Sequence, residues 1–381
     1  MEENLIPGFE NFMEDTSVDV SVEVGDQEEV ETAMTTESEE TAAEQAEVSE
    51  AVAEEEQDAA AAEMIFRRFD EIEHMKMVAE KYGVDRTFLA LCNRNNVLAN
   101  QFKITLPSCE SFDTVGDPRS AESQACIEGL GKVLENVWEF IKKVCKKIKD
   151  FFVRLWDAIV TRLTGVDANI GRLRKAYEQR QDDEKGLKGN NKIRGDIITP
   201  TLLKKKTDDA KKLGIEAKNV ADEFKKLSGT FVNVSSSSST ISEGQVDALK
   251  IKCDDIAKKL DVIKLKDKDK KGKLTEIKWS AIPGMLDEAA KNKADLDGQK
   301  ATMDNVKYIA ENCIKLAENA EKRDDKDAAA NSKNARKYVS ALNRFSSLQA
   351  TITNVQMTAI NELIRGVALR IRYGSKKMAG Y

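Results

Sequence analysis

A run of apolar side chains repeats along residues 134–159 with the period of an α-helix. Successive members lie four or three residues apart in strict alternation: Leu134, Trp138, Ile141, Cys145, Ile148, Phe152, Leu155 and Ile159. A spacing of 3.5 residues places all of these side chains on one side of a helix. The sequence therefore predicts a long amphipathic helix over residues 120–163, closed by Gly165, whose apolar side must be covered.

Helical periodicity continues through most of the remaining chain. Aromatic residues make up only 6% of the sequence and there are five prolines, a composition that favours long amphipathic helices over a sheet sandwich. We expect helices over 64–82, 85–101, 169–180, 200–227, 243–263, 283–297, 299–321 and 327–373, and one short strand at 231–234. The predicted fold class is all-α: an elongated antiparallel helical bundle.

Charge divides the chain sharply at residue 63. Residues 1–63 contain 22 Asp or Glu and no Lys or Arg, whereas residues 64–381 contain 60 basic and 45 acidic side chains, a net charge of +15. A segment so acidic and so poor in large apolar residues is typical of disordered chain. We therefore expect a disordered acidic leader over 1–63. The predicted domains are a short helical segment and loop over 64–119, a helical domain over 120–234 and a C-terminal helical bundle over 235–381.

Residue types that carry catalysis or bind metals are scarce. His74 is the only histidine, and the six cysteines include no CxxC pair. One histidine excludes a His-rich metal site and leaves little room for a Ser/His/Asp triad, and no phosphate-binding glycine loop occurs. We expect no enzymatic activity, no cofactor and no metal. Reduced thiols and the lack of a secretory signal pattern favour a cytosolic setting.

A small-x-Glu tripeptide ends the acidic leader. Ala61-Ala62-Glu63 directly precedes Met64, where strong helical patterning begins, and Ser120-Ala121-Glu122 repeats the pattern. In its acidic leader, this motif and its basic helical body, the chain resembles the internal head (inner-body) proteins of giant (jumbo) tailed phages. In that family a maturation protease cuts capsid-interior proteins after small-x-Glu, and the products are packaged with the genome.

The resemblance implies a non-enzymatic virion protein of the capsid interior that is present in the host cytoplasm during assembly. Its implied partners are the maturation protease, other head proteins and phage DNA. Removal of residues 1–63 converts a chain of charge -7 into a body of +15, which would neutralise DNA phosphates and release counterions. A cut after Glu122 leaves a body of +16.

The basic side chains that we expect to contact DNA lie in the lysine-rich stretches 203–226 and 250–278 and near the C-terminus. The candidates are Lys204, Lys205, Lys206, Arg365, Arg370, Arg372, Lys376 and Lys377. No recognition-helix pattern accompanies them, so the expected binding is non-specific.

Three interpretations of the amphipathic helix at 132–163 remain open. It is a bundle helix, a homo-oligomeric coiled coil, or an interfacial helix that contacts a membrane. In the third case the apolar and basic contacts would come from Trp138, Phe152, Trp156, Lys142 and Lys146. The membrane contact gives one alternative function, a membrane-active protein ejected into the host with the genome. A second alternative rests on the acidic leader: a scaffold-like head assembly protein whose leader directs incorporation into the prohead.

Overall fold

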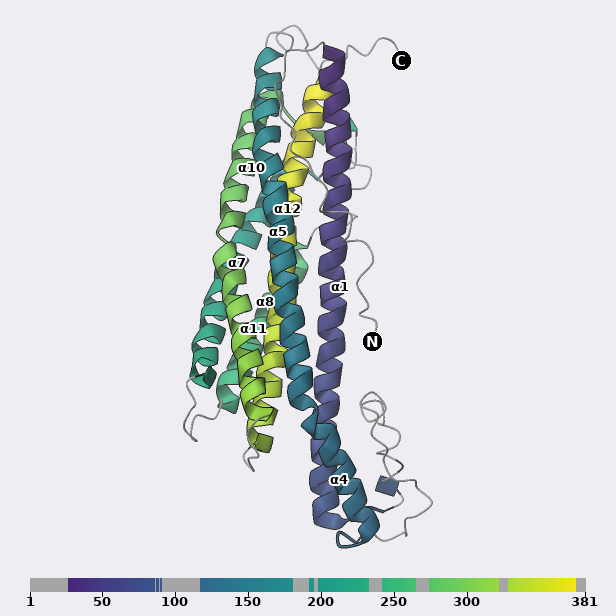
Figure 1. The fold of residues 1–381 in the computed structure, drawn as a ribbon. Coiled ribbons are helices and arrows are strands. Elements are labelled where there is room, and N and C mark those ends of the chain that lie inside the picture. Colours follow the sequence, from purple (N-terminus) through teal and green to yellow (C-terminus); the bar gives the residue numbers. More distant parts are fainter. Residues whose placement is uncertain are drawn as a thin grey trace.

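Long helices lie side by side along one axis in the computed structural model, which describes residues 27–85, 87, 88, 90, 117–180, 192–194, 198–232, 242–264, 274–321 and 328–374 (Figure 1). The elements are α1 (Gln27–Tyr82), α4 (Ala121–Glu135), α5 (Val137–Gln179), β1 (Lys192–Arg194), α7 (Pro200–Val232), α8 (Glu243–Ile263), β2 (Leu274–Glu276), η3 (Trp279–Ala281), α10 (Ile282–Asp297), α11 (Lys300–Glu321) and α12 (Ala328–Gly374). The predicted all-helical, elongated bundle is confirmed.

Helix α12 forms the centre of the bundle. It packs against α1, α5, α7, α8 and α10, and most of its side chains from Ala335 to Ile371 are buried. The Tyr338 hydroxyl donates a hydrogen bond of 2.7 Å to the Phe224 carbonyl of α7, and both rings pack edge to face. With 47 residues the helix is about 70 Å long, which sets the elongated shape of the molecule.

The helix expected over 120–163 is two helices in the structure. Ser120 caps α4 by accepting a hydrogen bond of 3.1 Å from the backbone N–H of Ser123. The helix is interrupted at Asn136, the C-cap of α4, and α5 begins at the next residue. Gly165 does not end α5, which continues to Gln179. The buried seam explains why: Leu163, Val166, Ile170 and Leu173 extend its 3.5-residue spacing past the glycine.

The β-structure differs from the expectation. Phe231 and Val232 form the end of α7 rather than a strand, and residues 233–234 lie outside the described part of the chain. The strands are β1 and β2, which pair antiparallel with Ile193 opposite Thr275. Of the lysine-rich stretch 250–278, residues 250–263 belong to α8 and residues 274–276 form β2, while residues 265–273 lie outside the described part of the chain.

Helix α1 crosses the Glu63–Met64 boundary without a break. Its buried positions keep a spacing of four and three residues on both sides of the boundary: Val48, Val52, Glu55, Ala59, Ala62, Phe66 and Phe69. In Figure 1 α1 runs along α12 for most of the length of the bundle. The disorder expected of the leader is therefore wrong for residues 48–63, while residues 1–26 lie outside the described part.

Candidate functional site

Residues 48–63 of α1, hereafter the acidic segment, lie across basic and polar side chains of three other helices. Glu56 accepts hydrogen bonds from the Lys264 ammonium at 3.0 Å and from the Thr351 hydroxyl at 2.7 Å. On the other flank Asp58 accepts one of 2.8 Å from Lys147 of α5. Carboxylates on both flanks of one helix are thus paired with cations that belong to the body of the protein.

Contacts to α12 extend along the acidic segment. The Asn343 side-chain amide donates a hydrogen bond of 3.0 Å to the Ala59 carbonyl. About three helical turns further along α12, the Asn354 amide lies 3.3 Å from the Ser49 hydroxyl. Between these polar contacts the buried side chains of the segment are small, mainly alanine and valine. The segment is therefore held by many small and polar contacts rather than by large apolar side chains.

Glu55 is the one carboxyl group on the buried side of the acidic segment. It is 8% exposed. Burial, reinforced by the negative charge of Asp58, raises the pKa of Glu55 to about 7, against the opposing effect of Lys147 and Arg154. Its charge state therefore changes close to neutral pH, at a position where the rest of the seam is apolar.

The second half of α1 is attached differently. Phe66 and Phe69 pack on Phe140 of α5, with ring centroids 5.1 and 5.9 Å apart respectively. We call residues 66–82 the anchored segment, because their contacts include these aromatic rings and a buried ion pair with α12.

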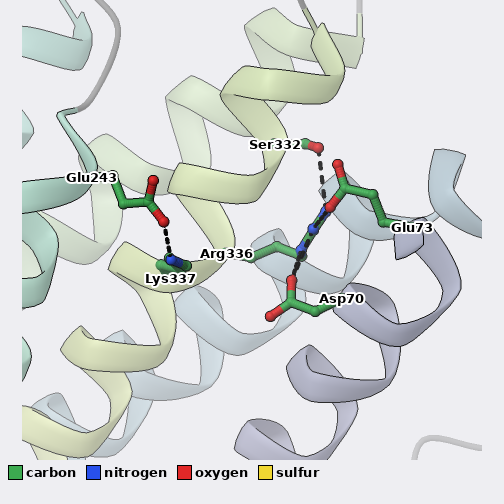
Figure 2. A network of polar contacts seen from close by, with 6 residues as sticks. All are labelled: Asp70, Glu73, Glu243, Ser332, Arg336 and Lys337. Atoms are coloured by element: carbon green, nitrogen blue, oxygen red, sulfur yellow. Dashed lines mark hydrogen bonds and ion pairs between the residues drawn. The ribbon is translucent and has the colours of Figure 1, made fainter. Parts of the chain in front are cut away.

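Figure 2 shows that ion pair. The guanidinium of Arg336 in α12 is 1% exposed and reaches between Asp70 and Glu73 of α1. Asp70 accepts two hydrogen bonds from it, at 3.0 and 2.9 Å, and a third donor reaches Ser332 at 3.2 Å. The next residue, Lys337, pairs with Glu243 of α8 at the surface.

The two predicted cleavage motifs lie in different structural contexts. Glu63 is in the middle of α1 and pairs with Arg67 at 2.9 Å, Ala61 is exposed, and the Met64 side chain is 63% exposed. Ser120 is the N-cap of α4, and Glu122 is exposed in its first turn. Because proteolysis concentrates at flexible chain and helix ends, a cut after Glu122 needs only fraying of one turn, whereas a cut after Glu63 needs α1 to unwind locally.

Only some of the candidate DNA-binding residues are exposed and able to contact DNA in this structure. Lys204 pairs with Glu288 at 3.3 Å, Lys205 is exposed, and Lys206 donates a hydrogen bond of 2.7 Å to the Lys264 carbonyl. These three lysines lie in the first turns of α7.

The C-terminal candidates diverge further from the expectation. Arg370 is only 3% exposed, because its guanidinium donates to the Ile277 carbonyl at 2.8 Å and lies over the Trp279 ring. A surface role for Arg370 is therefore wrong. Arg365 pairs with Glu362 at 3.8 Å, and Arg372 is half-buried. Lys376 and Lys377 lie outside the described residues.

The apolar seam of α5 is covered by the bundle. Trp138 and Phe152 are buried, and Trp156 is half-buried with the Lys300 ammonium 5.5 Å from its ring centroid. Lys142 is half-buried and Lys146 is exposed. In this conformation the aromatic side chains are core residues, as expected of a bundle helix. Within the described ranges, no helix combines the length and apolarity required to cross a membrane.

Sequence reasoning missed Glu55 in the seam of α1, and it missed Lys147, Lys264 and Arg336, which pair with carboxylates of α1. The signal that could have revealed the packed helix is the buried spacing that continues from Phe66 back to Val48. Alanine contributes little to a hydrophobic pattern, and Glu55 interrupts the spacing. The acidic composition of residues 48–63 therefore led to a prediction of disorder. Among the residues that the structure describes, no group of acidic, histidine or cysteine side chains is arranged to hold a metal ion. Neither a protein-family model, nor a curated protein, nor a solved structure matches this chain.

Proposed function

We propose that this chain is a non-enzymatic phage virion protein of the capsid interior, matured by proteolysis, whose processed body associates with packaged DNA or with an internal protein body. The observation that carries the proposal is the pairing of the acidic segment with basic side chains of the body. Glu56 and Asp58 occupy Lys264 and Lys147, side chains that an anionic partner would otherwise contact.

The charge arithmetic supports an assembly role for this pairing. The complete chain carries -7, and removal of residues 1–63 leaves +15. A chain that is acidic before the cut and basic after it would stay off DNA during assembly and neutralise phosphates afterwards. The resemblance to internal head proteins of giant tailed phages agrees with such a sequence of events.

The two small-x-Glu motifs define the products to look for. A cut after Glu63 yields a protein that starts at Met64 and keeps the anchored segment. A cut after Glu122 yields one that starts at Ser123, with α1 retained only by non-covalent contacts such as the Arg336 ion pair. Exposure of Glu122 at a helix end favours the second product in the folded protein.

Semi-tryptic mass spectrometry of purified particles tests the proposal. We expect the chain in the particle with an N-terminus at Met64 or Ser123, and peptides of the leader depleted relative to those of α12. Full-length chain in mature particles would contradict the maturation step. Absence of the chain from particles would contradict a virion role altogether.

A further inference from the structure

We propose that the acidic segment is an intramolecular cover, and that the surface beneath it binds the phosphate backbone of duplex DNA once the segment leaves. This basic surface consists of Lys147 of α5, Lys264 at the end of α8, and Thr351 of α12. The choice of DNA as the anion rests on the function proposed above, while the cover itself rests on the contacts of α1.

The first step of the argument is the placement of charge. The acidic segment carries Glu50, Glu54, Glu55, Glu56, Asp58 and Glu63 and no basic residue. Lys147 and Lys264 contact it from opposite flanks, so the two cations are separated by about the width of a helix, about 10 Å. Release of the segment leaves both ammonium groups facing the same strip of surface.

The second step is the chemistry of that strip. Glu56 accepts from an ammonium and from the Thr351 hydroxyl at the same time. An oxygen that accepts from a lysine and a threonine is in the environment that proteins commonly offer to a phosphate oxygen. The Asn343 and Asn354 side chains, which now contact the segment's backbone and Ser49, add neutral donors along α12.

The third step is that the cover is built to leave while the rest of α1 stays. The acidic segment buries alanines, valines and the single carboxyl group of Glu55, whereas the anchored segment buries Phe66, Phe69 and a fully enclosed guanidinium. Small side chains bury little apolar area, and exposed ion pairs are weak and salt-sensitive. Separation of α1 from the bundle therefore starts at the acidic segment.

The test uses the full-length chain and two charge-matched double variants. E56Q/D58N removes the carboxylates that contact the basic surface. E71Q/E80Q removes two exposed carboxylates of the same helix within the anchored segment, which pair with their own neighbours Arg68 and Lys76. Both variants change the net charge equally and keep side-chain size.

We expect E56Q/D58N to bind duplex DNA about tenfold more tightly than the unaltered chain, and amide exchange of residues 48–63 to accelerate by a similar factor. The control variant should change neither by more than about twofold. Adding K147Q/K264Q to E56Q/D58N should remove the gain in DNA affinity and lower the slope of log K against log salt by about 2, whereas adding K132Q/K212Q, on exposed lysines elsewhere, should leave the gain in place.

Three results would overturn the inference. Equal gains in the two carboxylate variants would mean that only net charge matters. Faster exchange without tighter DNA binding would mean that the uncovered surface does not bind phosphate. Tighter DNA binding by E56Q/D58N that is insensitive to K147Q/K264Q would leave the proposed function standing and remove this surface from it.

Discussion

Glu55 illustrates how a single side chain can make the packing of a helix depend on pH. It occupies a seam position where its neighbours along the helix are Val52 and Ala59, yet it carries an ionisable group. Burial raises its pKa from an ordinary 4.5 to about 7. Folding therefore favours the protonated form, so the stabilisation associated with this group is fully present below pH 4.5 and is lost as the pH rises through about 7.

The first prediction concerns E55Q. A pKa difference between 4.5 and about 7 corresponds to about 3 kcal/mol of lost stability at pH 8. Because glutamine mimics the protonated carboxyl, E55Q should protect the amides of residues 48–63 at pH 8 and have little effect at pH 5. Hydrogen exchange at the two pH values measures this, with E54Q on the exposed side as the control. A pH dependence that survives in E55Q would contradict the assignment to Glu55.

Arg336 shows the opposite case, a charge that attaches two helices permanently. The second prediction is that R336M destabilises the protein by about 3 kcal/mol, because Asp70 and Glu73 lose a buried partner. Urea unfolding at pH 7 measures the change in the free energy of unfolding.

The adjacent lysine provides the control for that measurement. K337M, which breaks the surface pair with Glu243, should cost at most about 1 kcal/mol. Combining R336M with D70N and E73Q should recover part of the lost stability, because no uncompensated carboxylates then remain. Equal effects of R336M and K337M would show that the Arg336 pair is no stronger than a surface salt bridge.

At the scale of elements, α1 and α5 both continue through residues that the sequence marks as boundaries. Continuous burial overrides the local signal in each case. Gly165 and Gly171 of α5 lie on the exposed side of a helix whose buried seam is uninterrupted, and neither is near any other atom that an added methyl group would meet. Packing of Leu163 and Val166 outweighs the roughly 1 kcal/mol by which one glycine weakens a helix.

The third prediction uses that exposed glycine. G165A should stabilise the protein by about 0.5–1 kcal/mol, since alanine keeps the helical conformation at a lower entropic cost. Thermal or urea unfolding measures the gain.

Gly83 is the matched opposite, because it ends α1 with φ of +77° and a Cβ there would lie 2.5 Å from the Asp117 backbone. We expect G83A to lower the stability by more than G165A raises it. Stabilisation by G83A, or destabilisation by G165A, would contradict these assignments of the two glycines.

At the scale of the whole molecule, the bundle arranges an acidic helix on a basic body. The described residues of α1, α5, α8 and α12 contribute to one hydrophobic core, so the acidic segment is part of the packed structure as well as a source of charge. Many lysines elsewhere pair with carboxylates of neighbouring helices, for example Lys211 with Asp295 and Lys259 with Glu216. Lys147 and Lys264 differ from these lysines, because their partners Asp58 and Glu56 belong to the acidic segment that a cut after Glu63 would remove.

The fourth prediction follows from that distribution. The body 64–381 should bind duplex DNA without sequence preference, and the full chain should bind much more weakly. If about five phosphates are neutralised, the slope of log K against log salt should be about -4 to -5. Filter-binding titrations of both chains at several salt concentrations measure this. Equal affinities would contradict a shielding role for the leader, and binding by neither would remove DNA as the partner.

Periodicity by itself determined the helices and much of the core of this protein. Helices 243–263 and 299–321 were predicted within one residue of α8 and α11, because an amphipathic pattern needs only the spacing of side chains along one chain. The seam of α5 was predicted on the same basis, and its side chains are buried as the bundle interpretation expects. For these elements the local signal and the tertiary packing agree.

Only the tertiary structure decided what packs against each face of a helix. Composition indicated that residues 48–63 cannot fold alone, but α12 supplies the surface on which Val48, Val52 and Ala59 are buried. Likewise the sequence shows Arg370 and Lys147 as equivalent basic residues, whereas the fold buries one beside Trp279 and pairs the other with Asp58. Spacing along a chain encodes which side of a helix is apolar, but burial and charge pairing depend on neighbours that are hundreds of residues away.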